Sequence, residues 1–279
     1  MNDQLRKLQL TQIGILKVID QICRKHGIQY SLYAGTLLGA VRHQGFIPWD
    51  DDLDICMARD DYNRFIEIWD TVPHDGFILQ NKENSPAFTQ SFTKIRKDHT
   101  TFLQDEREIG LYHTGIFVDI FPVDRLPAGK LAQIQFYWNV MQYQLFTREF
   151  IPSKANGIVK LISELFLNAV PVGKREQKRK KLLAKITAHN NNPSLQAVSI
   201  ETIESMKQHH SPYMFDEYVE LSFDSEAFMC YAGWDNHLKV KYGDYMQLPP
   251  ESERVWKHHP ILIDFEHNYE ELPKEMKIK

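Results

Sequence analysis

The chain has 279 residues, of which 43% are hydrophobic and 25% charged, a composition typical of globular proteins and unlike that of disordered or collagenous chains. Its 33 basic and 37 acidic side chains give a net charge of −4, which argues against a protein that holds nucleic acid through a globally basic surface. Three widely separated cysteines offer neither a disulfide framework nor a CxxC metal site, and no segment is typical of a secretory signal or a membrane-spanning helix. We therefore expect a cytoplasmic protein.

The first part of the chain alternates between helical and strand patterns. Apolar residues at helical spacing predict a helix from Asp3 to His26 that ends at Gly27. A short helix is predicted at 37–42, and another, capped by Asp60 or Asp61, ends at Trp69. Period-two alternation predicts strands at 28–33, 52–57, 77–81, 90–96 and 115–121.

After Pro127 the pattern changes, and apolar residues recur mainly at helical spacing. Helices are predicted over 128–150, 155–170 and 174–190, followed by a polar, loop-rich region from 193 to 212. The sequence thus predicts an α+β fold. A mixed sheet with flanking helices occupies residues 1–126, and a mostly helical half occupies 127–279.

Four carboxylates fall within five positions at the start of the second predicted strand: Asp50, Asp51, Asp52 and Asp54. On a strand, Asp52 and Asp54 project from one face, roughly 7 Å apart. Like charges on one face repel each other, and Mg²⁺, which prefers oxygen ligands, would relieve that repulsion. The alternative is a solvated edge strand that follows a turn-forming Asp-Asp pair.

Asp119 interrupts a predicted strand that is otherwise as apolar as the centre of a sheet. A carboxylate buried there needs a partner, because burial of an unpaired charge costs several kcal/mol. Two partners are open at this point: a metal ion shared with the upstream aspartates, or a salt bridge to Lys94 or Arg96.

Backbone and basic groups near the acid run could contact a phosphorylated substrate. The Gly35-Thr36 turn allows close approach to the backbone and to the N–H groups that open the next helix, although it also fits an ordinary strand-to-helix turn. Arg42 and His43 can reach the same cleft. Alternatively, their positive charge simply interacts favourably with the dipole at the C-terminal end of their helix. Lys94 and Arg96 share one strand face and offer phosphate or carboxylate partners.

The run YSLYAGTLLGAVRHQGFIPWDDDLDICMARDDYNRF, from Tyr30 to Phe65, resembles the signature of the LicD family of phosphocholine transferases, relatives of the fukutin-type proteins. Further similarity lies in FTKIRKDHT (92–100), VDIFPVD (118–124) and KYGDYMQLPPESERVWKHHP (241–260). The resemblance implies a nucleotidyltransferase-like catalytic core over 1–126, with 127–279 completing the substrate cleft. Thr36 departs from the Gly or Ser that the wider superfamily has after the first glycine.

The resemblance also implies a reaction. A Mg²⁺-dependent enzyme, with Mn²⁺ as the alternative ion, would move phosphocholine from CDP-choline to a hydroxyl of a teichoic-acid or lipopolysaccharide precursor and release CMP. Asp52, Asp54 and Asp119 would hold the metal, although Asp119 also fits a general base. The expected substrate-binding residues are Gly35, Thr36, Arg42, His43, Trp49, Asp51, Lys94 and Arg96.

The quaternary ammonium of choline carries no hydrogen-bond donor, so aromatic faces should select it. Trp49, beside the acid run, is the favoured member, although core packing explains each aromatic candidate as well: Tyr33, Trp49, Tyr112, Tyr231, Trp234 and Tyr242. A different CDP-linked alcohol or nucleotide is the alternative substrate on this fold. A non-catalytic glycan-binding scaffold is the alternative of another class.

Residues 156–181 have a pattern that is compatible with attachment to a membrane surface. An apolar stripe is followed by six basic residues in eight positions: Lys174, Arg175, Lys178, Arg179, Lys180 and Lys181. This order suits peripheral attachment to anionic lipid at the inner face of the membrane, where a lipid-linked glycan acceptor would lie. A core helix followed by a solvated helix is the alternative.

Overall fold

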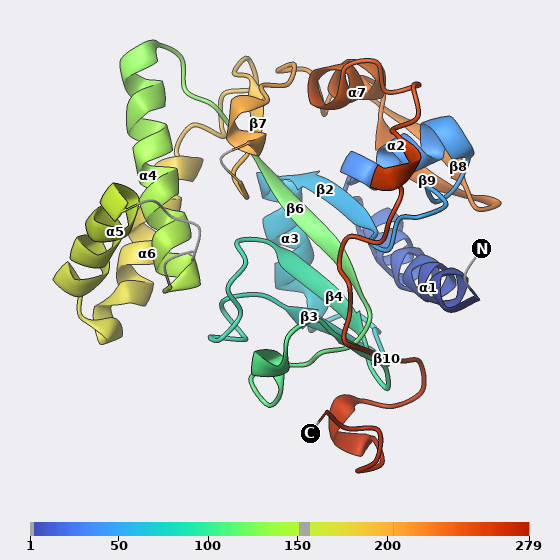
Figure 1. Ribbon diagram of the computed structural model, residues 1–279. Coiled ribbons are helices and arrows are strands. Elements are labelled where there is room, and N and C mark those ends of the chain that lie inside the picture. The colour runs from blue at the N-terminus through green and yellow to red at the C-terminus, as the bar shows by residue number, and fades with distance from the viewer. Residues whose placement is uncertain (1–2, 151–156, 203, 279) are drawn as a thin grey trace.

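A mixed sheet with strand order β1-β2-β6-β4-β3 forms the centre of the molecule, and β7 pairs with one end of β6 (Figure 1). The computed structural model describes residues 3–150, 157–202 and 204–278. Strand β6 is parallel to β2 and antiparallel to β4, and it is buried from Phe117 to Asp124. The strands are β1 (Ser31–Leu32), β2 (Asp54–Ala58), β3 (Phe77–Gln80), β4 (Thr93–Lys97), β6 (Phe117–Arg125) and β7 (Ala197–Ser199).

Three helices flank this sheet: α1 (Asp3–His26), α2 (Ala34–His43) and α3 (Arg59–Trp69). Helix α1 has the predicted bounds and is followed by Gly27 at φ 60°, the left-handed conformation that favours glycine. The predicted caps of α3 are wrong. Asp60 and Asp61 lie in its first turn, and its N-cap is Ala58, which has no capping side chain.

The predicted strands differ in extent from the observed ones. Those expected at 77–81, 90–96 and 115–121 are Phe77–Gln80, Thr93–Lys97 and Phe117–Arg125. The strand expected at 28–33 shortens to β1. The strand expected at 52–57 begins only at Asp54, although the Leu53 carbonyl already accepts a hydrogen bond from the Asp119 N–H of β6 at 3.0 Å. The loop before it is tied to α1. Gln9 donates to the Asp50 carbonyl at 2.9 Å, and Gln12 donates to the Asp51 carbonyl at 3.0 Å.

A buried ion pair links α3 to the end of β6. The Arg59 guanidinium donates to both carboxylate oxygens of Asp124, at 2.9 and 2.7 Å, and Asn190 adds a third hydrogen bond to that carboxylate. Both charged side chains are almost fully buried, and this bidentate geometry satisfies them where water does not.

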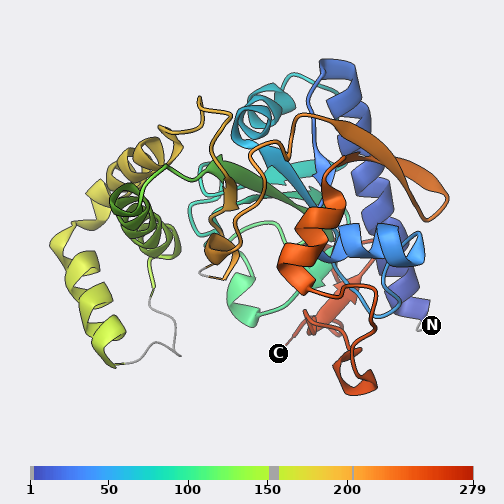
Figure 2. The same cartoon turned by 90° about the horizontal axis from the view of Figure 1, so that it is seen from above.

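A helical lobe follows the sheet, as the spacing after Pro127 predicts. It contains α4 (Lys130–Arg148), α5 (Gly157–Ala169) and α6 (Val172–Thr187). These helices lie to one side of the sheet (Figure 2) and share a separate apolar cluster that also includes Leu126, Val198 and Ile200. Residues 151–156, which include the start of the helix expected at 155–170, lie outside the described residues.

The C-terminal part packs against residues that precede 126 and adds strands that the sequence does not predict. A hairpin of β8 (Tyr218–Phe223) and β9 (Glu226–Tyr231) packs beside β1, and α7 (Trp234–Tyr242) lies near α2. Strand β10 (Leu262–Asp264) pairs with β5 (Thr101–Leu103). Because the main core contains Phe223, Tyr231 and Leu238, segments from both sides of residue 126 build one core. The domain boundary at 126/127 stays a prediction.

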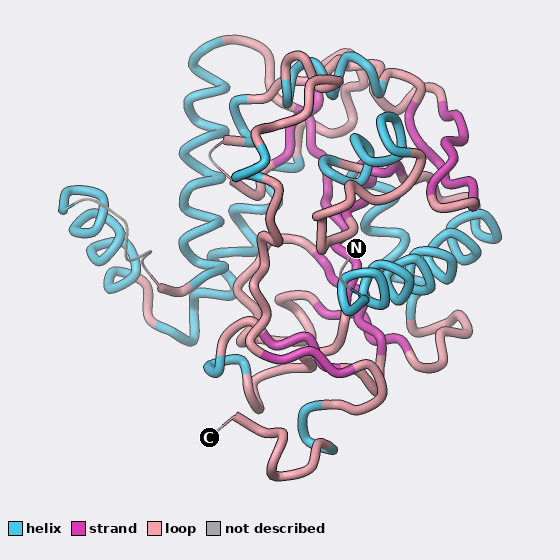
Figure 3. Tube along the Cα trace, turned by 45° about the vertical axis from the view of Figure 1, so that its right-hand side comes forward, coloured by secondary structure: helices cyan, strands magenta, loops and turns pink. Residues whose placement is uncertain are grey.

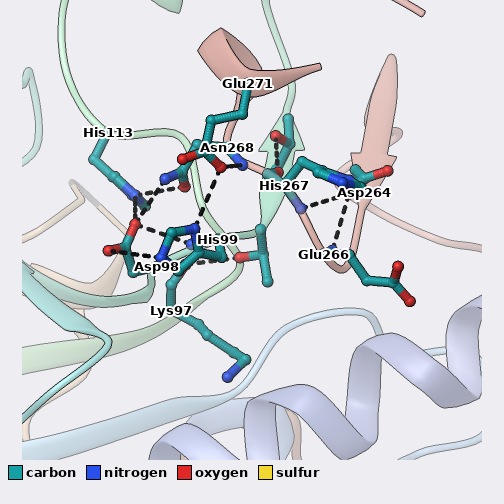
Figure 4. A network of polar contacts seen from close by, with 11 residues as sticks. Lys97, Asp98, His99, His113, Asp264, Glu266, His267, Asn268 and Glu271 are labelled. Carbon is teal, nitrogen blue, oxygen red and sulfur yellow. Dashed lines mark hydrogen bonds and ion pairs between the residues drawn. The ribbon is translucent and has the colours of Figure 1, made fainter. Parts of the chain in front are cut away.

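A polar network fixes the segment after β10 to the turn between β4 and β5 (Figure 4). Asn268 donates to Asp98 at 2.8 Å, and the His113 ring lies 3.2 Å from the same carboxylate. The side chains of Asn268 and Glu271 also form a reciprocal cap on the short helical turn at Tyr269–Glu271. The network therefore anchors the chain that follows β10.

Candidate active site

Three charged side chains meet where β2, β6 and β4 lie side by side. Asp54 and Asp119 are register partners in the parallel pair, and Lys94 faces Asp119 from the antiparallel strand. The Lys94 ammonium lies 2.6 Å from the Asp119 carboxylate, and both side chains are buried. The salt bridge considered from the sequence is therefore present, and it is made by Lys94.

The acid run forms a loop that leads into β2. Asp50 and Asp51 are buried, whereas Asp52 and Asp54 are half-buried. Thr36, in the first turn of α2, accepts a hydrogen bond from the Asp54 N–H at 2.8 Å. The Thr36 hydroxyl thus holds the start of β2, so the residue that departs from the superfamily pattern fixes a metal-ligand candidate in place.

The carboxylates of this loop repel one another. Burial raises the pKa of Asp54 well above its ordinary value, and the charges of Asp52, Asp119 and Asp50 raise it further. Burial likewise raises the pKa of Asp50, with the charge of Asp52 as the next cause. The site thus holds more negative charge than its own cations balance, and this imbalance favours a bound cation.

His258 joins the site, although the sequence argument left it outside. Its backbone N–H and its ring Nδ1 both lie 3.0 Å from the Asp51 carboxylate, and Nδ1 lies 3.9 Å from Asp52. Burial alone would raise the pKa of Asp51, but the hydrogen bonds and charge of His258 outweigh burial and lower it. Asp51, Asp52 and His258 offer ligand atoms within 4.8 Å of one another and form the metal-compatible cluster among the described residues.

A cavity of about 520 Å³ opens beside the acid run. Gly35, Arg42 and Trp49, three of the predicted substrate-binding residues, line it together with Asp50, Tyr242 and Lys257. Burial raises the pKa of Tyr242, and the charges of Asp54, Asp50 and Asp52 raise it further. The cavity therefore joins aromatic surface, cations and the acidic loop in one place.

The other predicted binding residues have partners within the protein. Arg96 is buried and donates to Gln80 at 2.6 Å and to the Gly115 carbonyl at 2.7 Å, so it does not reach the cavity. The His43 ring packs edge-on against Trp49, with 6.3 Å between the ring centroids. The charge of Arg254 lies 5.4 Å from the Trp49 ring centroid, so this ring already faces one cation.

Among the aromatic candidates for choline, Trp49 and Tyr242 line the cavity. Tyr33 and Tyr231 are almost fully buried in the main core. Trp234 packs partly buried against that core, and Tyr112 donates to Glu108 and packs edge-on against Phe88. The core-packing alternative therefore describes Tyr33 and Tyr231, whereas Trp49 and Tyr242 have access to a ligand.

Comparisons with known proteins bear on this site. A model of the nucleotidyltransferase domain shared by LicD, FKTN and FKRP matches residues 27–151, which contain all the carboxylates described above. The chain is 30% identical over 269 residues to the lipopolysaccharide cholinephosphotransferase LicD of Haemophilus influenzae, an alignment that covers 91% of this chain and 96% of that relative.

Two shorter alignments agree with this relationship. The chain is 47% identical over 153 residues to an uncharacterised protein of Rickettsia prowazekii, which covers 48% of this chain and 57% of that protein. It is 29% identical over 100 residues to the human ribitol 5-phosphate transferase FKRP, which covers 34% of this chain and 19% of that protein.

Proposed function

We propose that this chain, which belongs to the LicD/FKTN/FKRP nucleotidyltransferase family, transfers phosphocholine from CDP-choline to a hydroxyl of a cell-surface glycan precursor of the lipopolysaccharide or teichoic-acid type. The observation that carries the proposal is the alignment with a lipopolysaccharide cholinephosphotransferase over 96% of that relative's length. The charged and aromatic cavity beside Asp50 supports it, because a diphosphate and a quaternary ammonium need those two kinds of surface.

The donor set at the acid run fits Mg²⁺, with Mn²⁺ as the alternative ion. Asp52, Asp54 and Asp119 offer only oxygen ligands. Burial, followed by the charges of Asp52, Asp119 and Asp50, raises the pKa of Asp54, and a cation would relieve both effects. A bound Mg²⁺ would neutralise negative charge on the donor diphosphate. The Asp51–His258 pair adjoins this set and supplies a further nitrogen and oxygen.

The residues of the chain would bind and orient both substrates. Arg42 and Lys257 line the cavity and offer positive charge to the diphosphate, while Trp49 and Tyr242 offer ring surface to choline. The acceptor oxygen forms a bond to the phosphorus that carries choline, the bond from that phosphorus to CMP breaks, and the hydroxyl proton passes to a base. Asp119 fits the role of this base or that of a metal ligand. In either role its carboxylate would be held in place by the ion pair with Lys94.

The reaction is tested with purified protein, CDP-choline, Mg²⁺ and a glycan precursor, with CMP release as the measurement. We expect CMP release that requires the acceptor and stops in EDTA. Because a ribitol 5-phosphate transferase is among the relatives, CDP-ribitol and CDP-glycerol are the competing donors. Turnover of these donors without turnover of CDP-choline would show that the donor is another CDP-linked alcohol. Glycan binding without turnover of any donor would favour a non-catalytic scaffold protein.

Replacing Trp49 with leucine should raise KM for CDP-choline about tenfold and change kcat little, because a desolvated cation–π contact is worth about 1–2 kcal/mol. The exposed ring of Tyr213 provides the control, since it lies outside the cavity. If Trp49→Leu and Tyr213→Leu have equal KM values, Trp49 does not contact choline.

Replacing Gly35 with alanine should lower CMP release about tenfold with little change in stability. A Cβ at Gly35 would lie 2.8 Å from the Asp50 carboxylate and would push it from its position in the cavity wall. Gly14→Ala is the matched control, because a Cβ there meets nothing within 4 Å. Equal activity of the two variants would show that the position of Asp50 is unimportant.

A further inference from the structure

Helix α5 is apolar on two opposite sides. One side packs into the helical lobe, where Leu167 is buried and the Phe166 ring lies 5.5 Å from that of Trp138. The other side is exposed: Ile158 keeps 74% and Leu165 62% of their accessible surface, and Leu161 and Ile162 continue the stripe. Apolar residues at helical spacing normally face apolar surroundings, so the exposed apolar stripe of α5 lacks a partner within the described chain.

Helix α4 carries a second exposed apolar stripe at helical spacing. It consists of Leu131, which is 85% exposed, and of Ile134, Trp138 and Met141. The contact between Trp138 and Phe166 joins this stripe to α5. Figure 3 shows α5 at the left edge of the molecule, outside α4 and α6. The apolar surface is therefore larger than the segment 156–181, whose first residue lies outside the described residues.

Helix α6 sorts its basic residues onto two sides. Arg179 is buried and binds Glu83 at 2.7 Å, while Arg175 donates to the Leu167 carbonyl at 3.0 Å, so both arginines hold the lobe together. A lysine stripe lies on another side at spacings of four, three and four residues: Lys174, Lys178, Lys181 and Lys185, of which Lys178 is half-buried and the others are exposed. Lys180 is exposed as well and pairs with Glu176 at 2.6 Å. The exposed charge is thus a lysine stripe, smaller than the six-residue basic run in the sequence.

We propose that the apolar stripes of α4 and α5 enter the headgroup layer of an anionic membrane while the lysine stripe of α6 binds lipid phosphates. Among the described residues no helix is long and apolar enough to cross a bilayer, so this contact lies on the surface. An anionic membrane offers both an apolar layer and negative charge. A second copy of the chain would instead bring lysine stripes of like charge together. The proposal does not depend on the proposed reaction.

The apolar part is tested by vesicle co-sedimentation without substrates. Wild-type protein should sediment with vesicles of phosphatidylglycerol and phosphatidylcholine in equal parts, and much less with phosphatidylcholine alone. The double variant Leu161→Gln/Leu165→Gln should bind at least tenfold more weakly. Leu111→Gln/Met276→Gln is the matched control, because Leu111 and Met276 are equally apolar, exposed side chains outside the lobe. Equal binding of both variants would overturn the proposal.

The charged part is tested with Lys174→Gln/Lys181→Gln, for which we expect roughly 25-fold weaker binding, since each lysine near an anionic surface contributes about fivefold. The control Lys25→Gln/Lys274→Gln removes two exposed lysines outside the lobe. Binding of wild-type protein should weaken at about 0.5 M salt. Salt-independent binding, or a wild-type dimer that the Leu161→Gln/Leu165→Gln variant makes monomeric, would show that another partner covers this surface. CMP release measured in parallel separates this result from failure of the proposed reaction.

Discussion

Replacing Asp54 with asparagine should reduce CMP release about a thousandfold while leaving the protein folded. Asparagine keeps the shape of the side chain but loses the charge that a cation needs, and charge stabilisation by a metal is worth several kcal/mol in a transition state. Asp60→Asn, at an exposed carboxylate in the first turn of α3, should retain full activity. Substantial turnover by Asp54→Asn would contradict the role of Asp54 as a metal ligand.

The same variant should be more stable than wild type when metal is removed. Because the pKa of Asp54 is raised on folding, its carboxyl contributes stability fully below its ordinary pKa of about 4 and loses that stability as pH rises through the folded pKa. Asparagine carries no charge at any pH. In thermal melts in EDTA, the Tm of Asp54→Asn relative to that of wild type should therefore increase between pH 4 and pH 7.

Metal should reverse this order of stability. Mg²⁺ binds the folded state and should raise the Tm of wild type, whereas Asp54→Asn should respond weakly. If Mg²⁺ stabilises both proteins equally, the ion binds elsewhere, and the Asp51–His258 cluster becomes the first place to examine. Activity and stability thus change in opposite directions at one residue, as expected of a strained functional site.

The central sheet and its carboxylates are predictable because their signals are local. Alternation predicts that Asp54 and Asp119 lie on strands, and the structure shows that these strands are neighbours and that the two residues are register partners. The bounds of α1 follow from its apolar spacing and from Gly27. Parallel pairing of β2 with β6 then leaves each aspartate opposite the other, and this pairing is seen only in the structure.

The rest of the site depends on contacts between distant parts of the chain. His258 reaches Asp51 because β10 pairs with β5 and the Asn268 network anchors the segment beyond it. No local pattern carries that information, although the resemblance over 241–260 includes His258. The hairpin β8–β9 turns at Asp224 and Ser225, both at positive φ, and this pair is a much weaker turn signal than Asn-Gly.

Replacing Lys94 with methionine should destabilise the metal-free protein by about 3–5 kcal/mol. Lys94 and Asp119 are buried partners at 2.6 Å, and removal of one member leaves an uncompensated buried charge. Lys17→Met is the control, since the Lys17–Glu226 pair has 2.7 Å between its charged atoms but is exposed, and it should cost less than about 1 kcal/mol. Denaturant unfolding in EDTA measures both. A loss below about 1 kcal/mol for Lys94→Met would contradict the importance of the buried pair.

The double variant Lys94→Met/Asp119→Leu distinguishes the cost of leaving one buried charge unpaired from the cost of losing the whole ion pair. Because an apolar pair of similar volume often replaces a buried ion pair at little cost, it should be more stable than Lys94→Met alone. Mg²⁺ then distinguishes the roles of Asp119. If Asp119 is a metal ligand, Mg²⁺ should restore much of the stability of Lys94→Met, because the ion takes the place of the ammonium beside the carboxylate. If Asp119 is a base held by Lys94, Mg²⁺ should stabilise Lys94→Met no more than wild type, and the pH profile of CMP release should shift.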